Sequence, residues 1–415
     1  SRVAWIPWAK RDANDPDPEA VLMKFPERFS NLPAHAWPRL RALLDVHAPG
    51  GDVINMTIGE PKHTFPAWVT QVISDNAAGF NSYPPNEGSD ALRGAIAGWI
   101  KRRYGVYVDA ASQIMALNGT REGLYNAAMA LCPETKNGQQ PVVLTPNPFY
   151  QVYMVAAISV QAEPVYVPAT RETGHLPDFA ALPAEILDRT TIAYVCSPAN
   201  PQGAVADETY WRRLIELAEK HDFQIFADEC YSEIYRDTAP TGAIEVASAM
   251  GADPERVLIF HSLSKRSNLP GLRSGFVAGG PESIRRIQQL RNYAGAPLPL
   301  PLQAAAAAVW ADEDHVIENR RLYAEKFDLA DRILGNVAGY RSPEAGFFLW
   351  LPVPDGEAAA LKLWQDTGVR VLPGSYLSQD VHGENPGAGY IRVALVAPKE
   401  DTQRGLETIR DCLFQ

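Results

Sequence analysis

From residue 52 to about residue 295, short apolar runs alternate with amphipathic stretches. The apolar runs are predicted to be strands, at residues 52–58, 113–117, 142–144, 192–196, 224–227 and 257–260. The stretches at 121–131 and 208–221 repeat apolar residues at helical spacing. Strands that alternate with helices are typical of a mostly parallel sheet with helices on both faces, so an α/β fold is predicted.

Beyond residue 310 the pattern changes. Apolar residues recur at helical spacing from Val316 to Leu334, which predicts one long helix. A shorter helix is predicted from Trp37 to Leu44. Further elements are expected as strands at 345–351, 369–372 and 390–396 and as a last helix around 406–413. These elements predict a second, smaller α+β domain.

The chain is expected to divide into three parts. Residues 1–25 are rich in Pro and Asp and lack periodicity, which predicts an N-terminal arm. Residues 26–58 and 310–415 form the expected small domain, and residues 59–309 form the large one. A chain of 415 residues with 46% hydrophobic content is long enough for more than one core.

The composition narrows the class of partner. A net charge of −11 and a pI near 5.3 argue against nucleic acid, because binding a phosphate backbone requires clustered Lys and Arg. No apolar run approaches the ~20 residues of a membrane span, and the start of the chain lacks the apolar core of a signal peptide. We therefore predict a cytoplasmic protein that acts on small molecules. The four cysteines have no metal-ligand spacing, so no metal site is predicted.

Polar residues follow several predicted strands. Asn200, Asp228 and Lys265 each come after one of them. The carboxyl ends of parallel strands meet at one edge of a sheet, so an amide, a carboxylate and an amine are expected there together. Each residue alone has a commoner interpretation as a turn, a loop cap or a surface charge. Their recurrence at successive strand ends favours a shared site.

Another strand end predicts an anion site. Gly119, Thr120 and Arg121 follow an apolar run and open a helix, so free backbone amides and the positive helix end face outward. Ser262 and Arg273 belong to a different loop and are expected to share the bound anion. A phosphate is the anion that this combination suits best.

An amine, a ring partner and a phosphate site together predict pyridoxal phosphate as the cofactor. Lys265 can form a Schiff base with its aldehyde. Asp228 is expected to pair with the protonated pyridine nitrogen, which makes the ring an electron sink. Asn200 and Tyr231 are predicted to hydrogen-bond the phenolic oxygen, and Tyr150 is predicted to stack on the ring.

Motifs along residues 30–415 resemble those of the class I/II aminotransferases, which have pyridoxal phosphate fold type I. The motifs are Asn118-Gly119-Thr120-Arg121, Ser197-Pro198-Ala199-Asn200-Pro201-Gln202-Gly203, Asp228-Glu229-Cys230-Tyr231 and Ser262-Leu263-Ser264-Lys265 with Arg273. The resemblance implies Lys265 as Schiff-base lysine and proton shuttle. It implies Gly59 and Arg392 as substrate-binding residues. The planar guanidinium of Arg392 is expected to bind the substrate's α-carboxylate through two parallel hydrogen bonds. It also implies a homodimer in which Tyr83 reaches the cofactor phosphate across the interface.

Within the family, the chain is most similar to succinyldiaminopimelate aminotransferases. The similar stretches are residues 59–63, 147–151, 228–235, 265–276 and 372–377. The similarity implies a step of lysine biosynthesis, with glutamate as amino donor and N-succinyl-2-amino-6-oxopimelate as acceptor. The chain departs from the family at Thr120, at Gln202 and over residues 292–300. The last departure lies near expected substrate contacts and leaves the acceptor open.

Three alternatives remain open on the sequence. Lyases and decarboxylases of the same fold share the residues that surround the cofactor, so the sequence does not separate them from aminotransferases. Another acceptor is possible, such as oxaloacetate, acetylated ornithine semialdehyde or unsuccinylated tetrahydrodipicolinate; a dicarboxylic acceptor needs a second cation, for which Arg291 and Lys62 are candidates. A non-catalytic regulator on this fold would carry a basic DNA-binding domain, for which neither terminus offers the length or the charge.

Overall fold

The computed structural model describes residues 24–415. The chain divides into two compact units, Ser1–Pro33 and Ala34–Gln415. In the first unit, the Ser30 hydroxyl donates a hydrogen bond to the Glu27 carbonyl at 2.7 Å. The predicted arm at residues 1–25 lies outside the described residues except for its last two. The predicted boundaries of the small and large domains stay a prediction.

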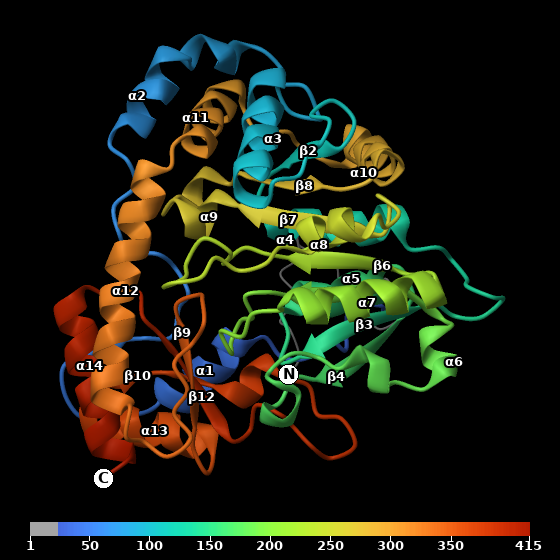
Figure 1. Ribbon diagram of the computed structural model, residues 1–415. Helices are drawn as coiled ribbons and strands as arrows, with labels where there is room; N and C mark the ends of the chain where they lie inside the picture. The colour runs from blue at the N-terminus through green and yellow to red at the C-terminus, as the bar shows by residue number, and fades with distance from the viewer. Residues whose placement is uncertain (1–23) are drawn as a thin grey trace, which may run out of the picture. The chain divides into compact units, whose positions relative to one another are not determined.

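A seven-stranded sheet forms the centre of the second unit (Figure 1). In spatial order its strands are β2 (Ile114–Leu117), β8 (Gly275–Ala278), β7 (Val257–Ser262), β6 (Gln224–Asp228), β5 (Thr190–Cys196), β3 (Val142–Asn147) and β4 (Glu163–Pro168). β8 is antiparallel to both neighbours, and the other neighbouring pairs are parallel. Six of these strands, all except β4, are buried along nearly their whole length, as strands covered on both faces require. The predicted mostly parallel sheet is confirmed.

Helices cover both faces of this sheet (Figure 1). α7 (Glu208–His221) and α8 (Ala243–Met250) lie on one face, and α4 (Thr120–Leu131) and α5 (Gln151–Ser159) lie on the other. α7 spans the residues predicted for it. The helix begins after Asp207, because the Asp207 side chain caps the first turn by accepting a hydrogen bond from the Tyr210 amide at 2.7 Å. Its apolar side, which includes Trp211, is buried in the core.

The remaining helices of this part lie around the sheet and its edges. They are α2 (Trp68–Asp75), α3 (Asp90–Tyr104), α6 (Ala184–Leu187), α9 (Leu263–Arg266), α10 (Pro281–Ala294) and α11 (Leu300–Ala311). α11 packs against α2 and α3, and its run of small alanine side chains allows that close approach. α9 follows β7 directly and carries Lys265.

A second group of elements surrounds α12 (Asp314–Leu334), the long helix that the apolar spacing predicts. α12 runs from α11 to α14 (Lys399–Leu413), against which it packs (Figure 1). Around it lie α1 (Ala36–Leu44), α13 (Gly356–Thr367), the paired strands β1 (Ile54–Asn55) and β10 (Val369–Arg370), and the antiparallel sheet of β11 (Leu372–Pro373), β12 (Tyr390–Ala394) and β9 (Phe348–Pro352). These elements bury a hydrophobic cluster of their own, which includes Phe327, Leu349 and Ile409.

The strand predicted over residues 52–58 is much shorter in the structure. Only Ile54–Asn55 pairs with a neighbouring strand, β10. Past this point the backbone has other partners: the Thr57 carbonyl accepts a hydrogen bond from the Arg392 side chain at 2.8 Å. Between these points the Met56 amide donates to the Arg370 carbonyl at 2.9 Å and the Met56 carbonyl accepts from the Ala394 amide at 2.8 Å, so regular pairing with β10 gives way to single contacts with two strands.

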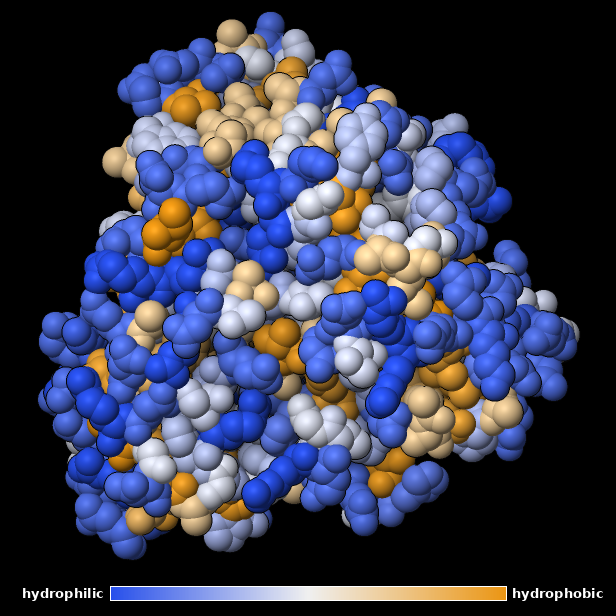
Figure 2. Space-filling model, in the orientation of Figure 1, coloured by the Kyte–Doolittle hydropathy of each residue, from blue (hydrophilic) through white to orange (hydrophobic). Residues whose placement is uncertain are grey.

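The surface in the orientation of Figure 1 is mostly hydrophilic, and hydrophobic residues on it form small, scattered groups (Figure 2). Among residues 24–415, every helix is too short or too polar to cross a lipid bilayer.

Candidate active site

A cavity of about 560 Å³ lies at the carboxyl ends of β5, β6 and β7. Ligand sites of open α/β sheets form at this edge, because the loops that follow parallel strands meet there. Most of the site residues predicted from the sequence line the cavity: Gly59, Thr120, Arg121, Tyr150, Asn200, Asp228, Tyr231, Ser262, Lys265, Arg273 and Arg392. The fold therefore gathers side chains that are far apart in the sequence.

Lys265 lies in α9, directly after β7. Its Nζ donates a hydrogen bond to the carbonyl oxygen of Gly59. Burial lowers the pKa of Lys265 to about 8, and the positive charges of Arg392 and Arg273 act in the same direction. Near neutral pH, Lys265 therefore has a larger fraction of neutral, nucleophilic amine than an ordinary lysine.

Asp228 is the last residue of β6 and is buried. The Tyr153 hydroxyl donates a hydrogen bond to Asp228 Oδ2 at 2.6 Å. Burial raises the pKa of Asp228, and the hydrogen bond from Tyr153 opposes that shift. A protonated ring nitrogen beside this carboxylate would supply a positive charge and favour its ionised form. Tyr153 was not predicted from the sequence, where its only signal is its place one turn after Tyr150.

The amino end of α4 and the loop after β7 form a site for an anion. Gly119 precedes α4 with φ near 90°, where glycine is favoured, and a Cβ there would lie 2.9 Å from Cζ of Arg273. Arg273 Nη2 donates to the Asn118 carbonyl at 3.2 Å. Nearby, the Ser262 hydroxyl donates to Ser264 Oγ at 2.9 Å. The guanidinium, hydroxyls and helix end suit a phosphate.

Other residues that line the cavity carry hydroxyl, thiol and aromatic side chains. Arg121 Nε donates a hydrogen bond to the Tyr150 hydroxyl oxygen at 2.7 Å, which ties Tyr150 to the first turn of α4. Thr120 Oγ1 lies 3.1 Å from Cys230 Sγ. Burial raises the pKa of Tyr231 well above its ordinary value, so its phenol keeps its proton and can donate a hydrogen bond.

Arg392, in β12, is a buried guanidinium with no carboxylate partner among residues 24–415. Its Nη1 donates to Asn200 Oδ1 at 3.0 Å, and its Nη2 donates to the Thr57 carbonyl at 2.8 Å. Its Nε is buried without a hydrogen-bond partner, and its Cζ lies 4.1 Å from the centroid of the Phe348 ring. Burial lowers the pKa of Arg392 to about 10. A bound carboxylate would supply the missing negative charge.

Gly119 is not among the lining residues, although its neighbour Thr120 is, and three further residues singled out in the sequence lie away from the cavity. Tyr83 is fully exposed. Arg291 is buried and directed towards α4, where it donates to Asn126 Oδ1 at 3.0 Å. Lys62 is half-exposed, pairs with Glu60 at 2.5 Å and borders a separate surface cavity. Neither candidate for a second substrate cation faces the groups around Lys265.

The residues of the cavity fit pyridoxal phosphate by their chemistry. The Lys265 amine can react with an aldehyde. The buried carboxylate of Asp228 forms no ion pair with any residue from 24 to 415, and a protonated pyridine nitrogen would provide one. The space left open by Gly119 beside Arg273 provides backbone amides and a guanidinium for the phosphate. Arg392 remains for a substrate carboxylate.

Known proteins resemble this chain over nearly its whole length. The family model for aminotransferase class I and II matches residues 51–409. An LL-diaminopimelate aminotransferase of Dehalococcoides mccartyi is 31% identical over 393 residues, which are 92% of this chain and 97% of the relative. The crystal structure of an aminotransferase from Neisseria meningitidis is 38% identical, with a TM-score of 0.89 and coverage of 92% and 98%. A probable N-succinyldiaminopimelate aminotransferase from Thermus thermophilus shares the fold, at 24% identity, a TM-score of 0.78 and coverage of 91% and 98%.

The pKa of Lys265 predicts how its amine reacts in protein freed of cofactor. Below about pH 8 the amine is protonated and unreactive, and above it the amine is neutral. Acetylation of Lys265, followed by peptide mass spectrometry across a pH series, should show a midpoint near pH 8. A midpoint near ~10.4, as for an ordinary lysine, would show that burial does not tune this amine.

Proposed function

Because this chain belongs to the class I and II aminotransferases, a family of pyridoxal-phosphate-dependent enzymes, we propose that it moves an amino group between glutamate and a substrate of the diaminopimelate class. The chain is a pyridoxal-phosphate-dependent aminotransferase. The observation that carries the proposal is the buried guanidinium of Arg392, which has no carboxylate partner in the described part of the chain and shares a cavity with the Lys265 amine. A substrate that is both an amine and a carboxylic acid satisfies both groups.

Two acceptors of this class are candidates. The relative from Dehalococcoides mccartyi bears the name of LL-diaminopimelate and is 31% identical, so it favours the unsuccinylated acceptor, tetrahydrodipicolinate. The succinylated acceptor, N-succinyl-2-amino-6-oxopimelate, is the second candidate and rests on the motif similarity around Lys265. The 24% identical structure supports the fold and carries no weight on the acceptor. Either acceptor would place the enzyme in lysine biosynthesis.

Pyridoxal phosphate, when bound, supplies an electron sink for the carbanion that forms at the substrate α-carbon. Lys265 would take the proton from that carbon and return it, since its lowered pKa of about 8 gives it a larger neutral fraction near neutral pH than an ordinary lysine has. Arg392 would hold the α-carboxylate through parallel hydrogen bonds, with Asn200 orienting the guanidinium. Asp228, oriented by Tyr153, would hold the ring nitrogen.

We also propose that the enzyme is a homodimer and that Tyr83 acts across the interface. Tyr83 and Tyr293 are large aromatic side chains that are almost wholly exposed. The segments that carry them adjoin, because Asn86 Nδ2 donates to Asn292 Oδ1 at 3.0 Å. Exposed aromatic side chains gathered in one place are typical of an interaction surface. The cytoplasmic location predicted from the sequence stays a prediction.

A panel of donors and acceptors tests the reaction. Glutamate should convert the visible band of the bound cofactor, and tetrahydrodipicolinate should restore it. Restoration by the succinylated acceptor alone would select the second candidate, and restoration by oxaloacetate alone would remove the diaminopimelate class. Release of ammonia or carbon dioxide without transfer would favour a lyase or decarboxylase. Lys265→Ala should abolish turnover, and full turnover by that variant would refute the role of Lys265.

Replacement of Arg392 tests whether its guanidinium binds the substrate carboxylate. Arg392→Lys keeps the positive charge and removes the second parallel hydrogen bond. A lost hydrogen bond to a charged group costs about 1.5–3 kcal/mol, so kcat/KM for glutamate should fall about tenfold to a hundredfold. Steady-state kinetics of both half-reactions measure the effect. An unchanged kcat/KM would mean that the carboxylate binds elsewhere.

Replacement of Tyr83 tests the interface. Tyr83→Phe removes one hydroxyl, and if that hydroxyl binds the partner's cofactor phosphate, the Kd for pyridoxal phosphate should rise about tenfold or more. Tyr107→Phe, at another exposed tyrosine, is the matched control. Sedimentation should show a dimer for both variants. A monomer, or an unaltered Kd in Tyr83→Phe, contradicts the proposed contact.

A further inference from the structure

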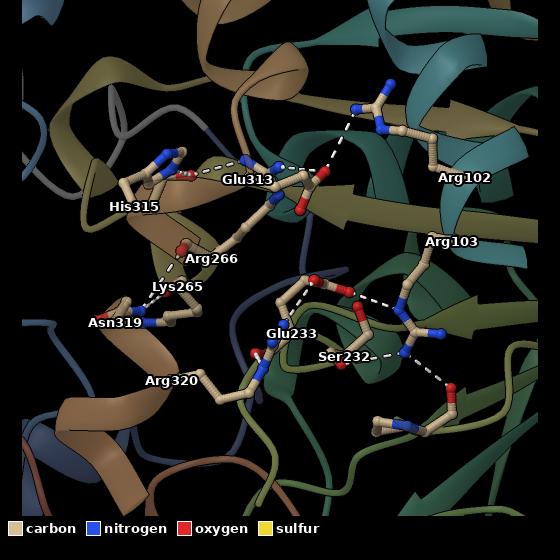
Figure 3. Close-up of polar contacts among 12 residues, drawn as sticks. Arg102, Arg103, Ser232, Glu233, Lys265, Arg266, Glu313, His315, Asn319 and Arg320 are labelled. Atoms are coloured by element: carbon tan, nitrogen blue, oxygen red, sulfur yellow. Dashed lines mark hydrogen bonds and ion pairs between the residues drawn. The ribbon is translucent and has the colours of Figure 1, made fainter. Parts of the chain in front are cut away.

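The residues after Lys265 are held by the junction of α11 and α12 (Figure 3). The Arg266 guanidinium turns away from the cavity and donates to the carbonyls of Val309 and Asp312 at 3.0 and 3.1 Å. The next residue, Ser267, has its hydroxyl 2.7 Å from His315 Nε2. The main chain just after Lys265 is therefore held by hydrogen bonds to the junction of α11 and α12, on the side away from the cavity.

Asn319, on α12, is the centre of this attachment. Its Nδ2 lies 3.4 Å from the carbonyl oxygens of both Lys265 and Arg266, and donates to them (Figure 3). Its Oδ1 accepts from Asn268 Nδ2 at 3.1 Å and lies 2.8 Å from His63 Nδ1. Carbonyl oxygens cannot donate, so this orientation of the amide is the one that satisfies all four partners.

His63 and Lys326 extend the chain of hydrogen bonds. Since His63 Nδ1 must donate to Asn319, its Nε2 is the acceptor, and Lys326 Nζ lies 2.9 Å from it. Lys326 is buried on α12, and no carboxylate among residues 24–415 pairs with it. Burial lowers the pKa of both groups, to about 8 for Lys326. A neutral imidazole with its proton on Nδ1 is the form that this arrangement requires.

The segment from Gly59 to His63 is thus linked to Lys265 in two ways, one direct and one through Asn319. The Gly59 carbonyl accepts a hydrogen bond from the side-chain amine, and His63, through Asn319, holds the main-chain carbonyl. A lysine side chain has four rotatable bonds, so the location of its amine depends on where its backbone is fixed. Two anchors from one segment restrict both ends of Lys265.

We propose that Asn319, oriented by His63 and Lys326, is a positioning residue that fixes the backbone of Lys265 so that its amine meets the reacting carbon. The inference rests on the proposed role of Lys265 as the proton-transferring amine. None of the three residues lines the cavity, so they act through Lys265 and not on the substrate. A small displacement of a catalytic group costs up to about a hundredfold in rate, which sets the scale of the effect.

A matched pair at His63 tests the chain of hydrogen bonds. His63→Asn keeps an N–H donor near the place of Nδ1 and loses the acceptor for Lys326. His63→Gln reaches towards Lys326 and loses the donor to Asn319. If the chain positions Lys265, His63→Gln should lower kcat by about tenfold to a hundredfold, and His63→Asn should recover most of that loss. Equal losses in the two variants would overturn the proposal.

Asn319→Asp tests the central residue, because a carboxylate cannot donate to the carbonyls of Lys265 and Arg266. Its kcat should fall by a similar factor, with KM for glutamate nearly unchanged. The pH midpoint of acetylation of Lys265 in cofactor-free protein should also move away from that of the wild type. Leu334→Ala, at the buried far end of α12, is the control that lowers the melting temperature without touching these hydrogen bonds.

The variants separate a structural role from a positioning role. If Asn319→Asp behaves like Leu334→Ala, with a lower melting temperature and unaltered kcat and acetylation midpoint, the positioning role is wrong. If Lys265→Ala itself keeps turnover, the proposed function of Lys265 fails whatever Asn319 does. If Lys265→Ala is inactive and Asn319→Asp is folded but slow, the results support both the function of Lys265 and the positioning role of Asn319.

Discussion

Buried positive charge without a negative partner is the constraint on which this molecule depends. Lys265 and Arg392 share one cavity, and within residues 24–415 neither is paired with a carboxylate. Taking such groups out of water is costly, and burial lowers the pKa of each as a result. The cost is offset when an anionic ligand enters. The cavity is therefore suited to an anionic ligand, as the proposed binding of a substrate carboxylate by Arg392 requires.

The rest of the fold keeps these charges in place. Parallel strands deliver Asp228 and Lys265 to one edge, while Arg392 comes from the separate sheet of β9, β11 and β12. The short stretch from Thr57 to Gly59 joins the two regions, since its carbonyls accept from Arg392 and from Lys265. That double use of backbone carbonyls ties the two cationic side chains of the cavity to one segment.

The sequence predicts best those features that depend on local pattern or on strand ends. The strand β6 and the helix α7 follow from apolar spacing, and Asp228 follows from its place after a strand. Tyr153 and Asn319 could not be predicted this way, because each is an ordinary helix residue whose partner lies far away in the chain. The full exposure of Tyr83 could not be predicted from the sequence either, because exposure depends on how the folded chain packs around the side chain.

The choice of acceptor narrows when the cations of the cavity are assigned in turn. Arg273 lies at the anion end beside Gly119, and Arg392 is free for the α-carboxylate. Arg291 is bound to α4, and Lys62, which does not line this cavity, is paired with Glu60. Of the arginines that line the described cavity, only Arg121 remains, and its Nε already donates to Tyr150. If the acceptor is dicarboxylic, as proposed, its distal carboxylate therefore has only Arg121 left among the arginines that line the cavity in residues 24–415.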